Sequence, residues 1–260
     1  YFKDDLILTG DIDESIISLL QFKEKLKSLK HYYTRYRSSE ELKWLFSRQL
    51  DKLYGDTQGL SLEITDNTPQ SQIDTIALAL VNRFLSDVDG RTAVDETKLR
   101  NAVKRSSDIT QDTIFLLARA VRASNWQSNT LLMERSIPVL QALTEVDPHK
   151  HYYFGQLGYA LKDQSKPDWR AAMENLAKAI ELCGDSDPYT LNFYLFNRAI
   201  CSIHLDENFA LDKPSAAAVR KSILNDLRTL QRDPRWFNDM LEQPHNLKLR
   251  KWLQLNGPRK

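Results

Sequence analysis

The chain has 260 residues, of which 42% are hydrophobic and 27% are charged, and its formal net charge is +1. These values are typical of a globular chain with enough apolar residues for a core, and they exclude a disordered or strongly basic protein. No apolar run approaches the roughly 18 residues of a membrane-spanning helix and no secretory leader is recognised, so a cytoplasmic protein is expected. Cys183 and Cys201 lie in helical apolar patterns and are predicted to be buried free thiols.

The region 1–55 is predicted to alternate strands and helices. A strand at Leu6–Leu8 precedes an amphipathic helix whose apolar residues run from Ile16 to Leu26. Alternating aromatic and polar residues predict a second strand at His31–Tyr36, and Ser38 or Ser39 caps a second helix. Strand, helix, strand and helix in this order are typical of a parallel α/β fold, here without its first half.

Three segments of this region resemble a known family. They are Tyr1-Phe2-Lys3-Asp4-Asp5, Leu20-Gln21-Phe22-Lys23 and Tyr36-Arg37-Ser38-Ser39-Glu40-Glu41-Leu42. Together they are similar to the second half of a Toll/interleukin-1 receptor-like (TIR-like) domain, of the type found at the front of bacterial multidomain defence proteins. In catalytic members of that family a glutamate, in the half that would precede Tyr1, cleaves the glycosidic bond of NAD. No residue matches it, and Glu40 and Glu41 are interpreted as first-turn helix carboxylates, so no catalytic or cofactor-binding residue is assigned.

A polar stretch at 56–70 is predicted to link this segment to a helical body at 71–234. The body repeats one cassette: an apolar residue, two others, an apolar residue, a small residue, two others and an apolar residue. The four copies are Ile73-Ile76-Ala77-Leu80, Ile114-Leu117-Ala118-Val121, Phe154-Leu157-Gly158-Leu161 and Phe193-Phe196-Asn197-Ile200, with small positions 41, 40 and 39 residues apart. A fixed period of about 40 residues predicts stacked helix pairs, each too small to bury its own apolar face.

The second helix of each predicted pair also has an apolar face. Its residues are Leu99 and Val103, then Leu140 and Leu143, then Ala172, Leu176 and Ala179, and finally Ile223, Leu227 and Leu230. The third unit, Tyr153–Gly184, resembles a tetratricopeptide repeat (TPR) in its order of large and small packing residues, with HEAT-type pairs as the alternative. Two further helices at 235–260 are predicted to cap the last pair. The predicted fold is mainly α, an α-solenoid of about four TPR-like pairs preceded by a partial α/β segment.

This stack is predicted to be a protein-interaction or sensing module, attached to a TIR-like effector in bacterial defence or signalling. Its first helices would present a concave groove to a peptide or protein partner. The candidate groove residues lie one turn from the packing face and are Asn82, Arg119, Arg122, Gln156, Tyr159, Asn192 and Arg198. The alternative is an NAD-hydrolysing TIR-like enzyme whose catalytic half lies upstream of Tyr1. Homo-oligomers would fit a TIR-like effector, but no sequence feature measures self-association.

Other candidate sites lack parts that their chemistry needs. His149 and His151 stand two residues apart, pointing to different sides of a helix, and no cysteine or acidic cluster completes a metal site. Basic residues between Lys23 and Arg37 alternate with tyrosines, as a single-strand nucleic-acid site would require, but Glu24 interrupts them. No metal, cofactor, nucleic acid or membrane is therefore an expected partner.

Overall fold

The computed structural model describes residues 2–3, 35–36, 64–86, 95–230 and 234–257. The chain divides into two compact units, Tyr1–Glu63 and Ile64–Lys260. This division falls inside the polar stretch at 56–70 that the sequence predicts as a linker. Most of the first unit lies outside the described residues.

Two short strands are described in the first unit, β1 (Phe2–Lys3) and β2 (Arg35–Tyr36). They pair in parallel, with Phe2 opposite Arg35 and Lys3 opposite Tyr36. Parallel strands need a crossover connection between them, and the predicted strand–helix–strand order would supply one. The predicted strand at Leu6–Leu8 and both predicted helices lie outside the described residues.

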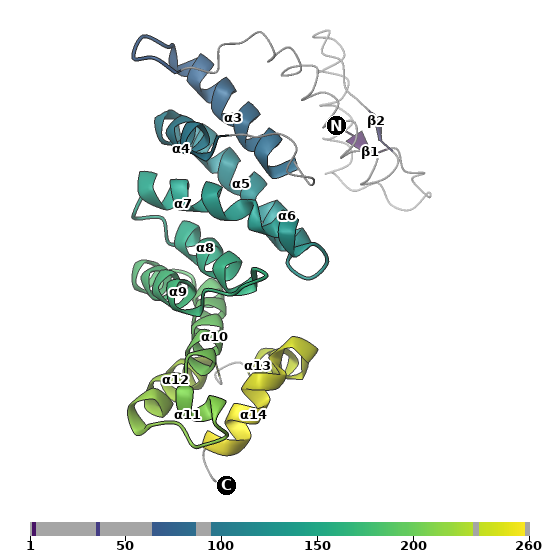
Figure 1. Ribbon diagram of the computed structural model, residues 1–260, viewed down its shortest axis with the longest axis vertical. Coiled ribbons are helices and arrows are strands. Elements are labelled where there is room, and N and C mark those ends of the chain that lie inside the picture. The colour runs from purple at the N-terminus through teal and green to yellow at the C-terminus, as the bar shows by residue number, and fades with distance from the viewer. Residues whose placement is uncertain (1, 4–34, 37–63, 87–94, 231–233, 258–260) are drawn as a thin grey trace, which may run out of the picture. The chain divides into compact units, whose positions relative to one another are not determined.

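The described part of the second unit consists of helices and the turns that connect them. The helices are α3 (Gln70–Ser86), α4 (Glu96–Arg105), α5 (Asp108–Asn125), α6 (Thr130–Glu134), α7 (Ser136–Val146), α8 (His151–Asp163), α9 (Trp169–Cys183), α10 (Pro188–His204), α11 (Glu207–Ala210), α12 (Ala217–Leu230), α13 (Pro234–Glu242), a 3-10 turn η2 (Pro244–Asn246) and α14 (Leu247–Asn256). Figure 1 shows them in succession, from α3 near the top to α14 near the bottom. The prediction of a mainly α-helical fold is confirmed for the described residues. None of these helices combines the length and apolar character needed to span a membrane.

Short polar side chains begin several of these helices. The Asp95 carboxylate accepts a hydrogen bond from the Thr97 backbone N–H at 2.8 Å and so caps α4. Asp187 caps α10 in the same way through the Thr190 N–H at 3.0 Å, and Pro188 then occupies the first helical position. An aspartate satisfies N–H groups that have no partner inside the helix, and proline has no N–H to satisfy there. The local sequence therefore fixes where these helices start.

The helices pack as successive pairs, α3 with α4, α5 with α7, α8 with α9, and α10 with α12. Each pair also contacts the next, through α4 with α7, α7 with α8, and α9 with α10. The ring of Phe115 on α5 lies 4.9 Å from that of Tyr152 and 5.1 Å from that of Tyr153, both on α8. The second and third pairs therefore share one core. The predicted apolar residues of the second helices are all buried.

The small positions of the cassettes follow the prediction in three pairs and depart from it in the fourth, and Leu117, Val121 and Phe154 are only half-buried. Ala77, Ala118 and Gly158 are buried at the expected small positions. Asn197 is only half-buried, and its side-chain amide donates to the Phe193 carbonyl on the same helix at 2.8 Å. On α10 the fully buried small residue is Ala199 instead. The short helix α6, which carries the buried Met133, is an addition that the repeat pattern does not predict.

The C-terminal segment covers the fourth pair, as the predicted cap requires. Phe237, Leu249 and Trp252 are buried in one cluster with residues of α10 and α12. The indole N–H of Trp252 donates to the Ser215 hydroxyl at 2.8 Å, and the Ser215 backbone N–H donates to the Asn256 side chain at 2.7 Å. These two hydrogen bonds connect the segment between α10 and α12 to α14 through Ser215.

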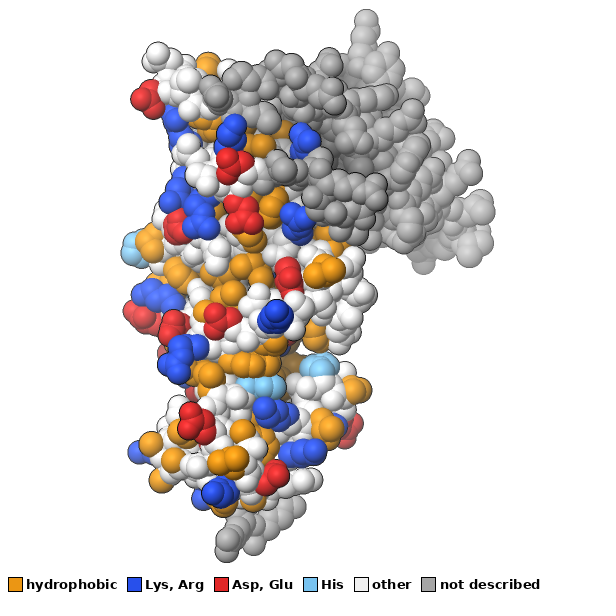
Figure 2. All heavy atoms as spheres, in the orientation of Figure 1, with side chains coloured by type: hydrophobic (Ala, Val, Ile, Leu, Met, Phe, Trp, Pro, Cys, Tyr) orange, Lys and Arg blue, Asp and Glu red, His pale blue; other side chains and the backbone are white. Residues whose placement is uncertain are grey.

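Charges of both signs are spread over the described surface. Figure 2 shows acidic and basic side chains interspersed on one face of the second unit, with hydrophobic side chains between them. Several charges form pairs between elements: Glu145 on α7 accepts from Arg100 at 2.5 Å and from Lys104 at 2.6 Å, both on α4. Cys183 and Cys201 are buried and free, as predicted.

Candidate functional site

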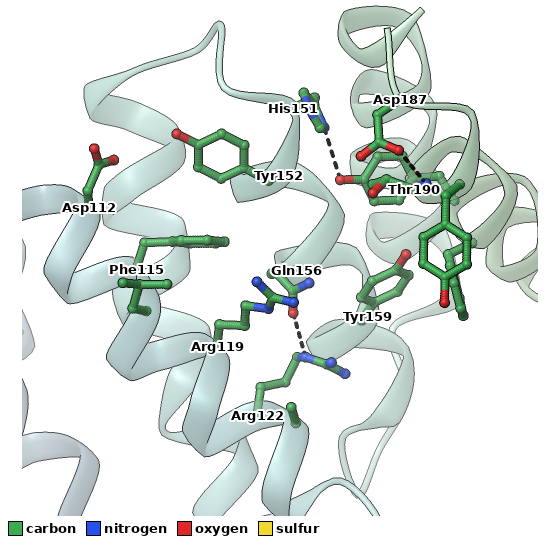
Figure 3. A pocket seen from close by; sticks show the side chains of 15 residues that line it. Asp112, Phe115, Arg119, Arg122, His151, Tyr152, Gln156, Tyr159, Asp187 and Thr190 are labelled. Atoms are coloured by element: carbon green, nitrogen blue, oxygen red, sulfur yellow. Dashed lines mark hydrogen bonds between the residues drawn. The ribbon is translucent and has the colours of Figure 1, made fainter. Parts of the chain in front are cut away.

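A cavity of about 710 Å³ lies between α5, α8 and α10, the first helices of three consecutive pairs. We call it the α5–α8–α10 groove. It is lined by Asp112, Phe115, Leu116, Arg119, Arg122, Ala123, His151, Tyr152, Gln156, Tyr159, Asp187, Tyr189, Thr190, Phe193 and Tyr194. On each helix the lining residues recur three or four positions apart, which places them on one face. Figure 3 shows the side chains of the three helices converging on this space.

Aromatic side chains form much of the groove wall. The rings of Tyr159 and Tyr194 lie 6.0 Å apart between α8 and α10, and those of Tyr189 and Phe193 lie 5.1 Å apart on α10. Burial raises the pKa of Tyr159. A phenol is already protonated at neutral pH, so the Tyr159 hydroxyl is a hydrogen-bond donor. The groove therefore offers flat apolar surfaces with hydroxyl groups at their edges.

Two exposed apolar side chains lie on opposite sides of the groove. Leu116 on α5 is 59% exposed and Tyr189 on α10 is 67% exposed. Exposed large hydrophobic side chains that gather around a concavity are typical of a binding surface.

The guanidinium of Arg122 is held in place by the groove itself. Its Nε donates to Oε1 of Gln156 at 2.7 Å, and its carbon lies 5.2 Å from the centre of the Tyr159 ring. One terminal nitrogen is 3.9 Å from the Asp163 carboxylate, and the side chain is only 14% exposed. Burial lowers the pKa of the Arg122 guanidinium, whereas the negative charge of Asp163 raises it. The guanidinium stays charged at neutral pH in spite of its burial. Arg122 thus orients Gln156.

Arg119, also on α5, lines the same groove but lacks the contacts that hold Arg122. Its side chain is exposed, and among the residues that the structure describes none forms a hydrogen bond or ion pair with it. Gln156, on α8, lines the same groove (Figure 3). Because Oε1 of Gln156 accepts from Arg122, the amide NH₂ of Gln156 is left with no described partner. The groove lining therefore includes a guanidinium and an amide donor that no described residue engages.

The acidic residues of the groove are already engaged. Asp112 accepts from the Lys150 ammonium at 2.9 Å and from the Tyr153 hydroxyl at 3.3 Å. Asp187 caps α10, and its hydrogen bond with Thr190 lowers the pKa of its carboxyl group. His151 and the Tyr194 hydroxyl are joined by a hydrogen bond of 3.1 Å. Among the lining residues, Arg119 is thus the cation that forms no described ion pair, while Asp187 is engaged by the first turn of α10.

Four of the seven predicted groove residues meet here: Arg119, Arg122, Gln156 and Tyr159. Asn82, on α3 in the first pair, and Asn192, on α10, do not line the cavity. Arg198 is engaged elsewhere, because both oxygens of Asp226 on α12 accept from it, at 2.9 Å and 2.6 Å. Its assignment to the groove is therefore corrected to a role in packing.

Several residues line the groove although the sequence pattern does not predict them as groove residues, namely Phe115, Leu116, His151, Tyr152, Tyr189 and Phe193. The sequence carries a signal for some of them, since Tyr189 and Phe193 are four residues apart on one helix and Tyr152 is four residues before Gln156. That spacing is shared by core aromatic residues, and only the packing of the helices shows which ones face a cavity.

A second cavity of about 200 Å³ shares Arg122, Tyr159 and Phe193 with the groove. It extends toward the C-terminal cap, where the rings of Trp126 and His245 lie 5.2 Å apart in an edge-to-face arrangement. The groove therefore adjoins a second space lined by residues of α5, α8, α10 and the cap.

Within the described ranges no group of three or more His, Cys, Asp or Glu side chains could hold a metal ion. His149 is exposed and His151 lines the groove, so the two histidines do not share a site. In comparisons with known proteins, no family model, curated protein or solved structure matches the chain. The case for a function therefore stands on the geometry of the groove.

Proposed function

We propose that the second unit is an interaction module that binds a peptide segment of a partner in the α5–α8–α10 groove. The observation that carries the proposal is one concavity of about 710 Å³ shared by the first helices of three successive pairs. Helical repeats recognise partners with such a preformed surface, so little ordering cost is added on binding. The exposed Leu116 and Tyr189 offer apolar contact, and Arg119 offers a charge.

A TPR-like solenoid is the repeat architecture that we propose for this unit. The serial packing of four helix pairs supports it, as does the close approach of α9 to Gly158 on α8. A Cβ at Gly158 would lie 2.7 Å from Leu176 Cγ and 3.1 Å from the Ala172 carbonyl oxygen. These are the small and large positions that the TPR resemblance assigns to the third unit.

For the first unit we propose the second half of a TIR-like effector domain, in a cytoplasmic defence or signalling protein. The parallel pairing of β1 with β2 supports an α/β fold there. In this proposal the NAD-cleaving half belongs upstream of Tyr1, so the chain itself should not consume NAD. Loss of NAD on incubation with the purified chain would contradict that assignment.

Selection of displayed random peptides against the whole chain tests the interaction proposal. Ala123→Trp should abolish binding of the selected peptides, because Ala123 is exposed and lines the groove. Ala120→Trp is the matched control: it places the same side chain at an exposed position of α5 outside the groove. Circular dichroism should show both variants folded. Failure to select any peptide, or equal binding to both variants, would refute the proposal.

A further inference from the structure

Arg119 is the one cationic side chain of the groove lining that pairs with no described acid, so it is available to an anionic group of a ligand. Asp112 and Asp187 are satisfied by Lys150 and by the first turn of α10, whereas Arg119 has no partner among the described residues. Resting on the proposed function, we infer that the groove selects a peptide segment carrying an aspartate or glutamate side chain beside a large apolar one. Arg119 is the residue that binds the carboxylate.

Arg122 cannot take this role without losing its present contacts. Its guanidinium is bonded to Gln156, lies over the Tyr159 ring and faces Asp163. Its contribution is to hold the Gln156 carbonyl oxygen, which leaves the amide NH₂ with no described partner. A carboxylate has two oxygens, and it can accept from a guanidinium and an amide at the same time. Arg122 is therefore a positioning residue for the Gln156 amide.

The carboxylate belongs to a side chain within the segment and not to a chain terminus. A second cavity of about 200 Å³ adjoins the groove at Arg122, Tyr159 and Phe193, which line both spaces. A segment whose carboxylate meets Arg119 can thus continue in that direction. Leu116 and Tyr189, 59% and 67% exposed on the two sides of the groove, supply the apolar contacts for its neighbouring residues.

An array of acetylated and amidated peptides tests this selectivity on the whole chain. One central position holds Glu, Gln or Lys, and the flanking positions run through Leu, Phe, Tyr and Ser. A second set presents the same apolar residues with a free terminal carboxylate and no internal acid. Affinities for the best peptides are measured by fluorescence anisotropy. The Glu peptides with apolar neighbours should bind about tenfold more tightly than their Gln counterparts, and more tightly than the free-carboxylate set.

A charge-reversal variant tests whether Arg119 is the residue that binds the peptide carboxylate. Arg119→Glu should invert the preference so that the Lys peptides bind best, and it should leave folding unchanged because the side chain is exposed. Arg170→Glu, an exposed position on α9 outside the groove, is the matched control and should keep the wild-type preference. The Glu preference should weaken as salt is raised, because salt screens exposed charges.

Three outcomes would overturn the inference. If Glu, Gln and Lys peptides bind equally and binding is still lost in Ala123→Trp, the groove binds peptides without reading an acid, and only this inference fails. If the free-carboxylate set binds best, the groove reads a chain terminus. If no peptide binds more tightly to the wild type than to Ala123→Trp, the inference and the proposed function fail together.

Discussion

Asp226 is a buried carboxylate on α12, and both of its oxygens accept hydrogen bonds from Arg198 on α10. Removing Arg198 would leave the buried Asp226 carboxylate without a counter-charge. The free-energy cost of that unpaired charge is larger than the net stabilisation that the intact pair provides. Arg198→Ala should therefore lower the free energy of unfolding by about 2 kcal/mol, a value reduced because Arg198 is partly exposed.

Urea denaturation of the whole chain measures this effect. Arg119→Ala is the matched control, since Arg119 is exposed and has no described partner. It should change the free energy of unfolding by less than about 0.5 kcal/mol. Equal losses in the two variants would contradict the assignment of Arg198 to packing and Arg119 to the groove.

The sequence places Arg119 and Arg198 in equivalent positions, each one residue after the small position of its cassette. Their difference arises from residues far along the chain. Asp226 comes 28 residues after Arg198, on the next helix of the pair, while no described residue pairs with Arg119. Spacing within one helix predicts which side chains leave the packing face, but it does not identify what another helix brings to meet them.

At the scale of elements, α8 and α9 approach closely because Gly158 has no side chain. A Cβ there would lie 2.7 Å from Leu176 Cγ. Gly158→Ala should therefore destabilise the chain by about 1–2 kcal/mol in thermal or urea unfolding, because overpacking outweighs the better helix propensity of alanine. In a double-mutant cycle with Leu176→Ala the two losses should be less than additive, since the smaller side chain removes the clash.

A stabilising effect of Gly158→Ala, or strictly additive losses in the cycle, would mean that helix propensity decides and that α8 and α9 are not in close contact at Gly158.

The helices themselves were largely predictable because the signals are local. Apolar spacing predicts the buried faces of the second helices, and Asp187 followed by Pro188 marks the start of α10. On α5 the spacing misses Phe115, which is buried, while the predicted Leu117 is only half-buried.

The prediction that Asn197 is a buried small position is wrong. Its side-chain amide donates to the Phe193 carbonyl on the same helix, so Asn197 does not have to pack against a neighbouring helix. Helix α6 escaped because five residues are too few to show a period.

At the scale of the whole molecule, His204 ties three helices together. Its ring stacks on Trp169 of α9 at 3.7 Å, and its Nδ1 accepts from the Lys248 ammonium of α14 at 3.2 Å. Burial, with a smaller contribution from the charge of Lys248, lowers the pKa of His204 to about 4 from its ordinary value of 6.5. The folded protein therefore holds this imidazole in its neutral form.

The sign of the pH dependence follows from that shift. Between pH 6.5 and pH 4 the unfolded chain binds a proton at His204 that the folded chain does not. This contribution to stability is complete above pH 6.5 and is lost as the pH falls toward 4. His204→Phe keeps an aromatic ring and removes the titration, so the wild type should lose more stability than the variant over this range. Parallel pH profiles of the unfolding free energy would contradict the prediction.

We infer that neighbouring helix pairs stabilise one another and so build the groove between their first helices. The contact of Phe115 on α5 with Tyr152 and Tyr153 on α8 is where the second and third pairs meet. Hydrogen exchange of Phe115→Leu, compared with the exposed Leu116→Ala, tests the claim most directly. We predict faster exchange in α8 and α9 as well as in α5 and α7 for Phe115→Leu, and no change for Leu116→Ala. Faster exchange confined to α5 and α7 would show that the pairs are independent and would contradict the claim.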